Sequence, residues 1–300
     1  MTYLTFKHML KVELKKSFGS EFKVISEIVP NNNSTPQDAI IIIKEGFPIA
    51  NKIWVAQFYQ EYCLGTSLEE IVSVLKESIM KTADTNSDLV EKLNDFECVK
   101  DRIVYRLLSR ESNDNLLKQV PWLPFMDIAI VFYISVDSEN TKQHMLITNE
   151  MLKHWEISID ILFKQAHMNT SRISPPVCIN IEALYLGLDL DNDHDIGFYN
   201  ENGLFPLYAL SNRSMKYGAV CILYEGLLSS IAEALNDDLI IYPSSIHEMI
   251  ICPLKYSKNK EESLSIVQIC NENEMEKQDV LTCNVYKFDK TSKKLEIWSE

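Results

Sequence analysis

Apolar residues recur at helical spacing near the start of the chain, with lysines between them: Phe6, Leu10, Leu14 and Phe18. This spacing predicts an amphipathic helix that ends at Gly19. Residues 21–29 and 39–44 are rich in β-branched side chains and predict two strands, separated by a loop of turn-forming residues.

The clearest helix in the sequence covers residues 67–81. Its apolar positions form one stripe, and Ser67 and Glu70 have the spacing of a capping box, in which each side chain binds the other residue's backbone N–H. Together with the preceding helix and strands, this pattern predicts an N-terminal α/β segment over residues 1–97.

Beyond residue 98 the pattern changes to short strands and helices, which predicts a main α+β domain over residues 98–300. The predicted strands cover 99–109, 126–136, 143–148, 205–211, 219–224, 238–242 and 249–254. The predicted helices cover 149–155 (with Thr148 as cap), 158–170, 226–236 and 261–273, and residues 279–298 predict a terminal β-hairpin.

This order of elements favours an α+β fold with mixed, mainly antiparallel sheets, packed helices and a C-terminal β-hairpin. The segment 187–203 is acidic and rich in Asn and Gly, and it predicts an exposed loop or a domain junction. Within it, the alternating aspartates of 189–195 suggest a calcium loop. The glycine and glutamate that an EF-hand requires are replaced by His194 and Asn200, so a solvated acidic loop is favoured.

Composition indicates an ordinary globular protein, with 46% hydrophobic and 24% charged residues. The net charge is −14 and the basic residues are scattered, so no nucleic-acid partner and no anionic membrane surface is expected. The N-terminus has no signal-peptide pattern and no apolar run is long enough to span a membrane, which predicts a soluble, cytoplasmic protein.

The seven cysteines lack any C-x-x-C pair and mostly stand in apolar runs, as reduced core thiols would. A reduced state again favours the cytoplasm. The six histidines have no metal-site spacing, and no phosphate-binding or dinucleotide-binding fingerprint is present. We therefore predict neither a metal site nor a cofactor.

The stretch "YPSSIHE" combines residue types that catalysis uses. Ser244 or Ser245 could act as a nucleophile, His247 as its base and Glu248 as an orienting carboxylate. The structural alternative is a turn in which Ser245 and Glu248 form a capping box and His247 hydrogen-bonds locally. The glycines of a nucleophile elbow are missing, so the structural alternative is favoured.

Polar clusters also stand at three predicted strand ends, where ligands often bind: residues 148–150, 211–213 and 244–245. Asn149, Asn212, Arg213 and Lys216 are the candidate ligand-binding residues, and the two basic ones suggest an anionic small ligand. Helix caps and turns require the same residue types, so a purely structural role remains the alternative.

Four stretches carry a resemblance to one bacterial family of unknown function: "DFECVKDRIVYRLLSRESNDNLLKQVPWLPFMDIAIVFYISV", "ITNEMLKHW", "LSNRSMKYGAVCILYEGLL" and "LIIYPSSIHEMIICP". The resemblance covers essentially the whole of this chain. The family occurs largely in gut-dwelling Gram-positive bacteria. A more distant likeness, in "YPSSIHEMIICPL" and the closing hairpin, is to another uncharacterised bacterial family. The resemblance implies a cytoplasmic bacterial accessory protein, and it implies no activity and no catalytic residues.

The sequence thus predicts a binding or accessory module whose partner is an unidentified small molecule or protein. The alternative is a hydrolase or transferase that uses the turn at 243–248.

Overall fold

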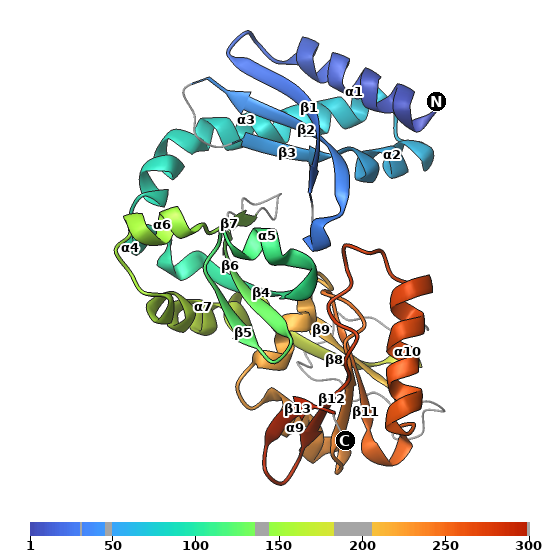
Figure 1. Ribbon diagram of the computed structural model, residues 1–300. Helices are drawn as coiled ribbons and strands as arrows, with labels where there is room; N and C mark the ends of the chain where they lie inside the picture. Colours follow the sequence, from blue (N-terminus) through green and yellow to red (C-terminus); the bar gives the residue numbers. More distant parts are fainter. Residues whose placement is uncertain (31, 46–49, 136–143, 183–205, 299–300) are drawn as a thin grey trace. The chain divides into compact units, whose positions relative to one another are not determined.

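The structure is a computed structural model, and it describes residues 1–30, 32–45, 50–135, 144–182 and 206–298 (Figure 1). The predicted junction at 187–203 and its acidic run 189–195 lie outside these residues. The chain divides into two compact units, the first over residues 1–99 and the second from Lys100 onward. That the units correspond to separate domains remains a prediction.

Unit 1 contains a three-stranded antiparallel sheet in the order β1-β2-β3. The strands are β1 (Phe22–Pro30), β2 (Pro36–Lys44) and β3 (Ala50–Trp54), with a short 3₁₀ turn η1 (Asn32–Ser34) between the first two. The helices are α1 (Tyr3–Ser17), α2 (Val55–Cys63), α3 (Leu68–Leu93) and α4 (Phe96–Val99).

The core of unit 1 follows the apolar spacing of its first helix. Phe6, Leu10 and Leu14 are fully buried and pack with Ile40 and Ile42 of β2. The predicted capping box starts α3, since Ser67 Oγ accepts from the Glu70 N–H at 3.2 Å and the Ser67 N–H donates to Glu70 Oε2 at 2.9 Å. Local side-chain chemistry therefore fixes where this helix begins.

Unit 2 begins with a four-stranded antiparallel sheet in the order β4-β6-β5, with β7 also paired to β6. The strands are β4 (Ile103–Ser109), β5 (Trp122–Phe125), β6 (Ile128–Ser135) and β7 (His144–Leu146). The helical segments are η2 (Lys100–Arg102), η3 (Glu111–Asn113), α5 (Asp114–Leu117), α6 (Asn149–His154) and α7 (Ile159–Ile173).

Helix α7 packs against β4 and satisfies the backbone of this edge strand. Thr170 Oγ1 accepts from the Tyr105 N–H at 3.1 Å, and Asn169 Nδ2 donates to the Ile103 carbonyl at 3.0 Å. Both side chains are buried. They replace ladder partners that an edge strand otherwise lacks.

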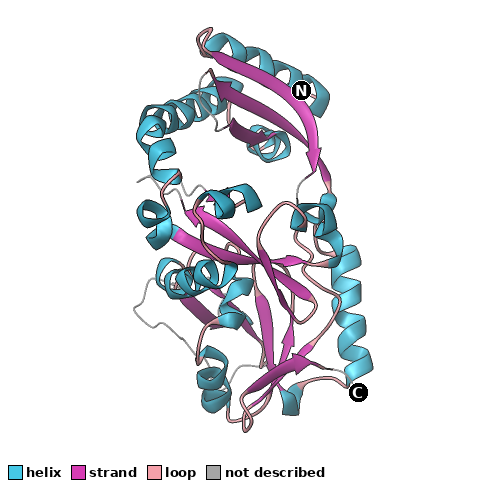
Figure 2. Ribbon diagram, turned by 60° about the vertical axis from the view of Figure 1, so that its left-hand side comes forward, coloured by secondary structure: helices cyan, strands magenta, loops and turns pink. Residues whose placement is uncertain are grey.

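The second sheet of unit 2 has six antiparallel strands in the order β13-β12-β10-β11-β9-β8. The strands are β8 (Pro176–Asn180), β9 (Tyr208–Asn212), β10 (Leu239–Tyr242), β11 (Met249–Pro253), β12 (Tyr286–Asp289) and β13 (Lys294–Ile297). The helical segments are η4 (Gly218–Leu223), α9 (Leu227–Leu235), η5 (Leu254–Tyr256) and α10 (Lys260–Asn273). Figure 2 shows α10 running along one side of this sheet.

The α+β prediction is confirmed, with antiparallel pairing between the described strands and a terminal hairpin of β12 and β13. The strand predicted at 219–224 is wrong, because Gly218–Leu223 is a 3₁₀ helix. Residues 218–222 are all buried. An apolar run buried on every side has no period that separates a helical turn from a strand.

Asp127, in the turn between β5 and β6, joins the two sheets of unit 2. Its carboxylate accepts hydrogen bonds from the Tyr286 hydroxyl at 2.7 Å and Asn284 Nδ2 at 2.9 Å, and also from the Thr282 hydroxyl. These three donors belong to β12 and the segment before it. One charged acceptor therefore fixes the first sheet to the second.

Candidate functional site

The turn at 243–248 connects β10 to β11 and is held by its own hydrogen bonds. Ser245 is buried, and its Oγ accepts from the His247 N–H at 2.9 Å. The Ser245 N–H donates to the Glu248 carbonyl at 3.2 Å, and the Ser244 hydroxyl donates to Glu248 Oε1 at 3.3 Å. The predicted capping box between Ser245 and Glu248 is therefore replaced by a serine turn, in which the hydroxyl binds the N–H two residues on.

His247 is held by partners that lie far away in the sequence. Its Nδ1 accepts from the Tyr217 N–H at 3.0 Å, and its Nε2 lies 3.5 Å from Asp279 Oδ1. A neutral imidazole that accepts at Nδ1 carries its proton on Nε2. Neither ring nitrogen is hydrogen-bonded to Ser244 or Ser245, so the turn presents no serine–histidine pair in this structure.

The bonds around Ser245 lead to an ordering of variant stabilities. Ser245→Ala removes one hydrogen bond from a buried turn and is expected to cost about 1 kcal/mol. Ile251→Ala deletes volume from a fully buried side chain of β11 and is expected to cost about 2–5 kcal/mol. Chemical denaturation of both variants checks this ordering, and a Ser245→Ala protein more stable than wild type would contradict a structural role for the hydroxyl.

The candidate ligand-binding residues fall in two places. Asn212 is buried and closes the turn after β9, because its Nδ2 donates to the Lys216 carbonyl at 2.8 Å and its Oδ1 accepts from the Ser214 N–H at 3.0 Å. Arg213 and Lys216 are exposed on the same turn. Asn149 instead begins α6, and its Nδ2 donates to the Lys118 carbonyl at 3.1 Å.

The turn after β9 and the turn after β10 are bound to each other. The His247 carbonyl accepts from the Ser211 hydroxyl at 2.8 Å and from the Gly218 N–H at 2.9 Å. Together with the bond from Tyr217 to the imidazole, these contacts unite two of the three predicted polar clusters. The structure does not connect Asn149 to them through any hydrogen bond between described residues.

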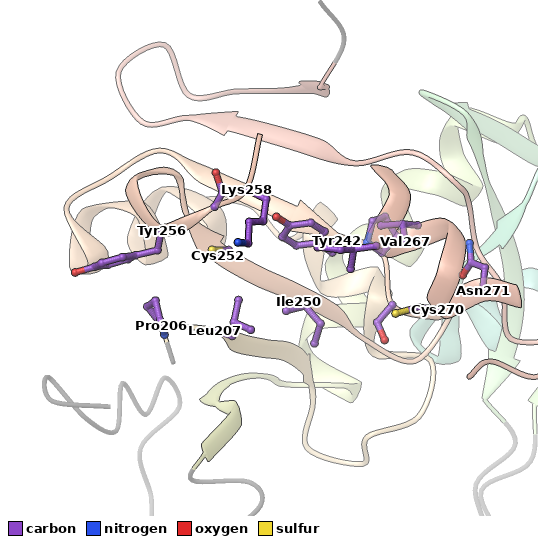
Figure 3. Close-up of a pocket in the computed structure, with 14 residues that line it drawn as sticks. Pro206, Leu207, Tyr242, Ile250, Cys252, Tyr256, Lys258, Val267, Cys270 and Asn271 are labelled. Carbon is purple, nitrogen blue, oxygen red and sulfur yellow. The ribbon is translucent and has the colours of Figure 1, made fainter. Parts of the chain in front are cut away.

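A pocket of about 360 Å³ lies beside this turn, between the six-stranded sheet and α10 (Figure 3). The sheet contributes Tyr242, Ile250 and Cys252, which project from one face of β10 and β11. Helix α10 contributes four residues at helical spacing: Ile266, Val267, Cys270 and Asn271. Ser244 also lines the pocket, whereas Ser245 and His247 do not.

The pocket wall is mainly apolar and neutral. Burial raises the pKa of the Cys252 thiol to about 11, so this sulfur is protonated at neutral pH and is a poor nucleophile. The Tyr242 hydroxyl shares a hydrogen bond with Ser263 Oγ at 3.0 Å, and burial raises the pKa of this phenol as well. The Cys252 thiol and the Tyr242 phenol are therefore both uncharged at neutral pH.

Among the described residues that line the pocket, Lys258 is the one with a charged side chain. Figure 3 shows its amino group turned toward the space between Cys252 and Tyr242, with Tyr256 and Asn271 at opposite ends. Sequence reasoning missed these residues. The alternation along β10 and β11 and the spacing along α10 reveal the two faces, but nothing in the sequence shows that the faces meet around an open space.

No group of three or more metal-binding side chains was found among the described residues. None of the described helices has the length and apolar character needed to cross a membrane. In comparisons with known proteins, residues 3–290 match a family described as a family of unknown function, DUF5688. No curated protein and no solved structure matches the chain.

Proposed function

The chain belongs to DUF5688, a family of unknown function, so its function has to be inferred from its own geometry, and we propose that it is a cytoplasmic bacterial binding protein. Its ligand is a small molecule with an apolar body and one anionic group. The observation that carries the proposal is the pocket between α10 and the sheet. A volume of about 360 Å³ falls in the range of small-molecule sites.

The wall of the pocket defines the apolar body of the ligand. Ile250, Ile266 and Val267 offer aliphatic surface, and the ring of Tyr256 adds an exposed aromatic surface. Transfer of apolar ligand surface from water onto such a wall contributes about 25 cal/mol for each Å² removed from water. A ligand that covers these residues gains its affinity mainly from this burial.

Lys258 defines the anionic group of the ligand. No ion pair joins its ammonium to an acidic side chain among the described residues. An anion beside it would gain a charge-assisted hydrogen bond, which is about twice as strong as a neutral one. The Asn271 amide and the Ser244 hydroxyl supply neutral polar partners elsewhere on the wall.

The compartment is inferred from the thiols, and the bacterial origin from the resemblance of the sequence. All seven cysteines are free, including three that are buried: Cys178, Cys221 and Cys252. Burial raises the pKa of Cys178 and Cys221 to about 12, which keeps these thiols unreactive. Free thiols throughout the chain favour a reducing compartment.

The proposal is tested with two probes that share an alkyl chain, decanoate and decan-1-ol. Decanoate is expected to raise the Tm of the wild-type protein, because a ligand that binds only the folded state stabilises it. Because Lys258 is exposed and solvent screens its charge, Lys258→Gln is expected to weaken decanoate binding about threefold, which corresponds to about 0.6 kcal/mol, and to leave decan-1-ol binding unchanged.

Lys255→Gln is the matched control for this experiment. Lys255 is exposed three residues earlier, lies over the Tyr256 ring at 5.1 Å and does not line the pocket. The Lys255→Gln protein is expected to bind both probes as the wild type does. Equal loss of decanoate binding in the two variants would show that general charge, and not the pocket, attracts the anion.

The hydrolase or transferase alternative has one supporting observation, the hydrogen bond from the Ser244 hydroxyl to Glu248 Oε1 on the pocket side of the turn. A carboxylate can accept the proton of a serine nucleophile. This arrangement lacks the imidazole of the original hypothesis, since His247 is bound to Tyr217 and faces Asp279. The binding function therefore has the stronger support.

A further inference from the structure

Arg106 is a cation buried inside unit 2, at 8% exposure. It lies on β4 opposite Val131 of β6, in a row of otherwise apolar side chains on that face of the four-stranded sheet. Its guanidinium carbon is 3.5 Å from the centroid of the Tyr217 ring and 4.5 Å from that of Tyr133. Two aromatic rings thus lie against one buried charge.

The tyrosines compensate this charge only in part. Burial lowers the pKa of the Arg106 guanidinium, whereas the neighbouring Tyr217 and Tyr133 raise it. Arginine nevertheless stays protonated in proteins, so the cost of burying the charge remains. No acidic side chain among the described residues forms an ion pair with it. Buried charges are normally paired, so an arginine that lies against two tyrosines and has no acidic partner is unusual.

The N–H edge of the guanidinium is not sealed from solvent. In the part of the chain that the structure describes, no nitrogen of Arg106 is both fully enclosed and without a hydrogen-bond partner. The Arg106 nitrogens without a partner are therefore still reached by solvent. A planar cation whose faces meet aromatic rings and whose donors remain accessible can accept a ligand at its edge.

The turn that carries Tyr217 is held rigidly. Tyr217 has a left-handed backbone (φ 56°), as does Met215 (φ 52°), a conformation that costs energy for residues with side chains. The bond from the Tyr217 N–H to His247 and the Asn212–Lys216 bond maintain it. The backbone that carries the Tyr217 ring is therefore held in place by these hydrogen bonds.

We propose that Arg106, with Tyr133 and Tyr217 against it, forms an anion site that binds a carboxylate or phosphate group of a small ligand. The guanidinium donates two parallel N–H bonds to two oxygens of the anion, a geometry that fits either group. Lys216, the residue before Tyr217, is exposed and adds a positive charge to the same turn. Arg106 does not line the pocket at Lys258, so this site is separate from the one in the proposed function.

The site can be tested in the intact protein by NMR of the arginine Nε–H groups, because the chain has only five arginines. Inorganic phosphate and malonate are titrated separately, with chloride keeping the ionic strength constant. The Nε–H signal of Arg106 is expected to shift in a saturable manner with at least one probe. That signal is assigned by its loss in Arg106→Lys, which keeps the charge but not the paired donors.

Arg110→Lys is the matched control, since Arg110 is exposed at the end of the same strand and lies over the Trp122 ring at 5.4 Å. In this variant the Arg106 signal is expected to shift as in the wild type. A response to phosphate alone or to malonate alone would identify the group that the site prefers.

The proposal is wrong if the Arg106 signal shifts with neither probe, or if it shifts no more with a probe than with chloride alone. This outcome is read in the wild-type protein and stands even if Arg106→Lys does not fold.

Discussion

Gly218→Ala is expected to destabilise unit 2 by about 3 kcal/mol, at the upper end of the usual cost of overpacking. A Cβ atom at this position would lie 2.1 Å from Ser211 Oγ, 2.6 Å from the Asn212 nitrogen and 2.7 Å from the His247 oxygen. The last two are backbone atoms and cannot rotate away. The turns after β9 and β10 would have to separate, with loss of the hydrogen bonds between them.

Urea denaturation followed by tryptophan fluorescence measures this effect. Gly226→Ala is the comparison, because Gly226 has open space around its Cα but a positive φ of 73°. It is expected to cost about 1 kcal/mol through backbone strain alone. A Gly218→Ala protein as stable as the wild type would show that the two turns are not packed as closely as described.

Asp127→Ala is expected to cost about 3–5 kcal/mol, because three hydrogen bonds to a charged acceptor are lost together. Tyr286 is fully buried and Thr282 is nearly so, and the hydroxyl of each would lose its acceptor. Burial and the neighbouring Asp127 carboxylate both raise the pKa of Tyr286, so the phenol remains a neutral donor that needs an acceptor.

The same denaturation experiment checks this variant against Asp114→Ala. Asp114 is exposed, and its removal is expected to change the free energy of unfolding by about 0.5 kcal/mol or less. Similar losses in the two variants would contradict the role of Asp127 as the connection between the two sheets.

Much of the fold could be predicted because its signals are local. The Ser67–Glu70 box and the Thr148 cap were confirmed, since a capping side chain binds backbone groups within three residues. By contrast, β3 and α2 were missed because Trp54 and Val55 join them directly, with no Gly or Pro to mark the change. The helical turn η4 was mistaken for a strand because it is buried on every side.

The candidate site was predictable only as a set of residue types. The turn at 243–248 was identified correctly as a polar connection, but the partners of His247 stand 30 and 32 positions away, at Tyr217 and Asp279. The contact between Arg106 and Tyr217 joins a strand of one sheet to a turn of the other. Such pairings depend on the tertiary fold, and no spacing in a single sequence reveals them.

The central claim, that the pocket beside α10 holds an apolar anionic ligand, is tested most directly by alkylation of Cys270. This half-buried thiol lines the pocket, whereas Cys63 and Cys98 are exposed and do not line it. Mass spectrometry can measure the reaction of each thiol with iodoacetamide in the presence and absence of decanoate. We expect decanoate to slow the alkylation of Cys270 and to leave the alkylation rates of Cys63 and Cys98 unchanged. An unchanged rate at Cys270, at decanoate concentrations that raise the Tm, would place the ligand elsewhere and contradict the account.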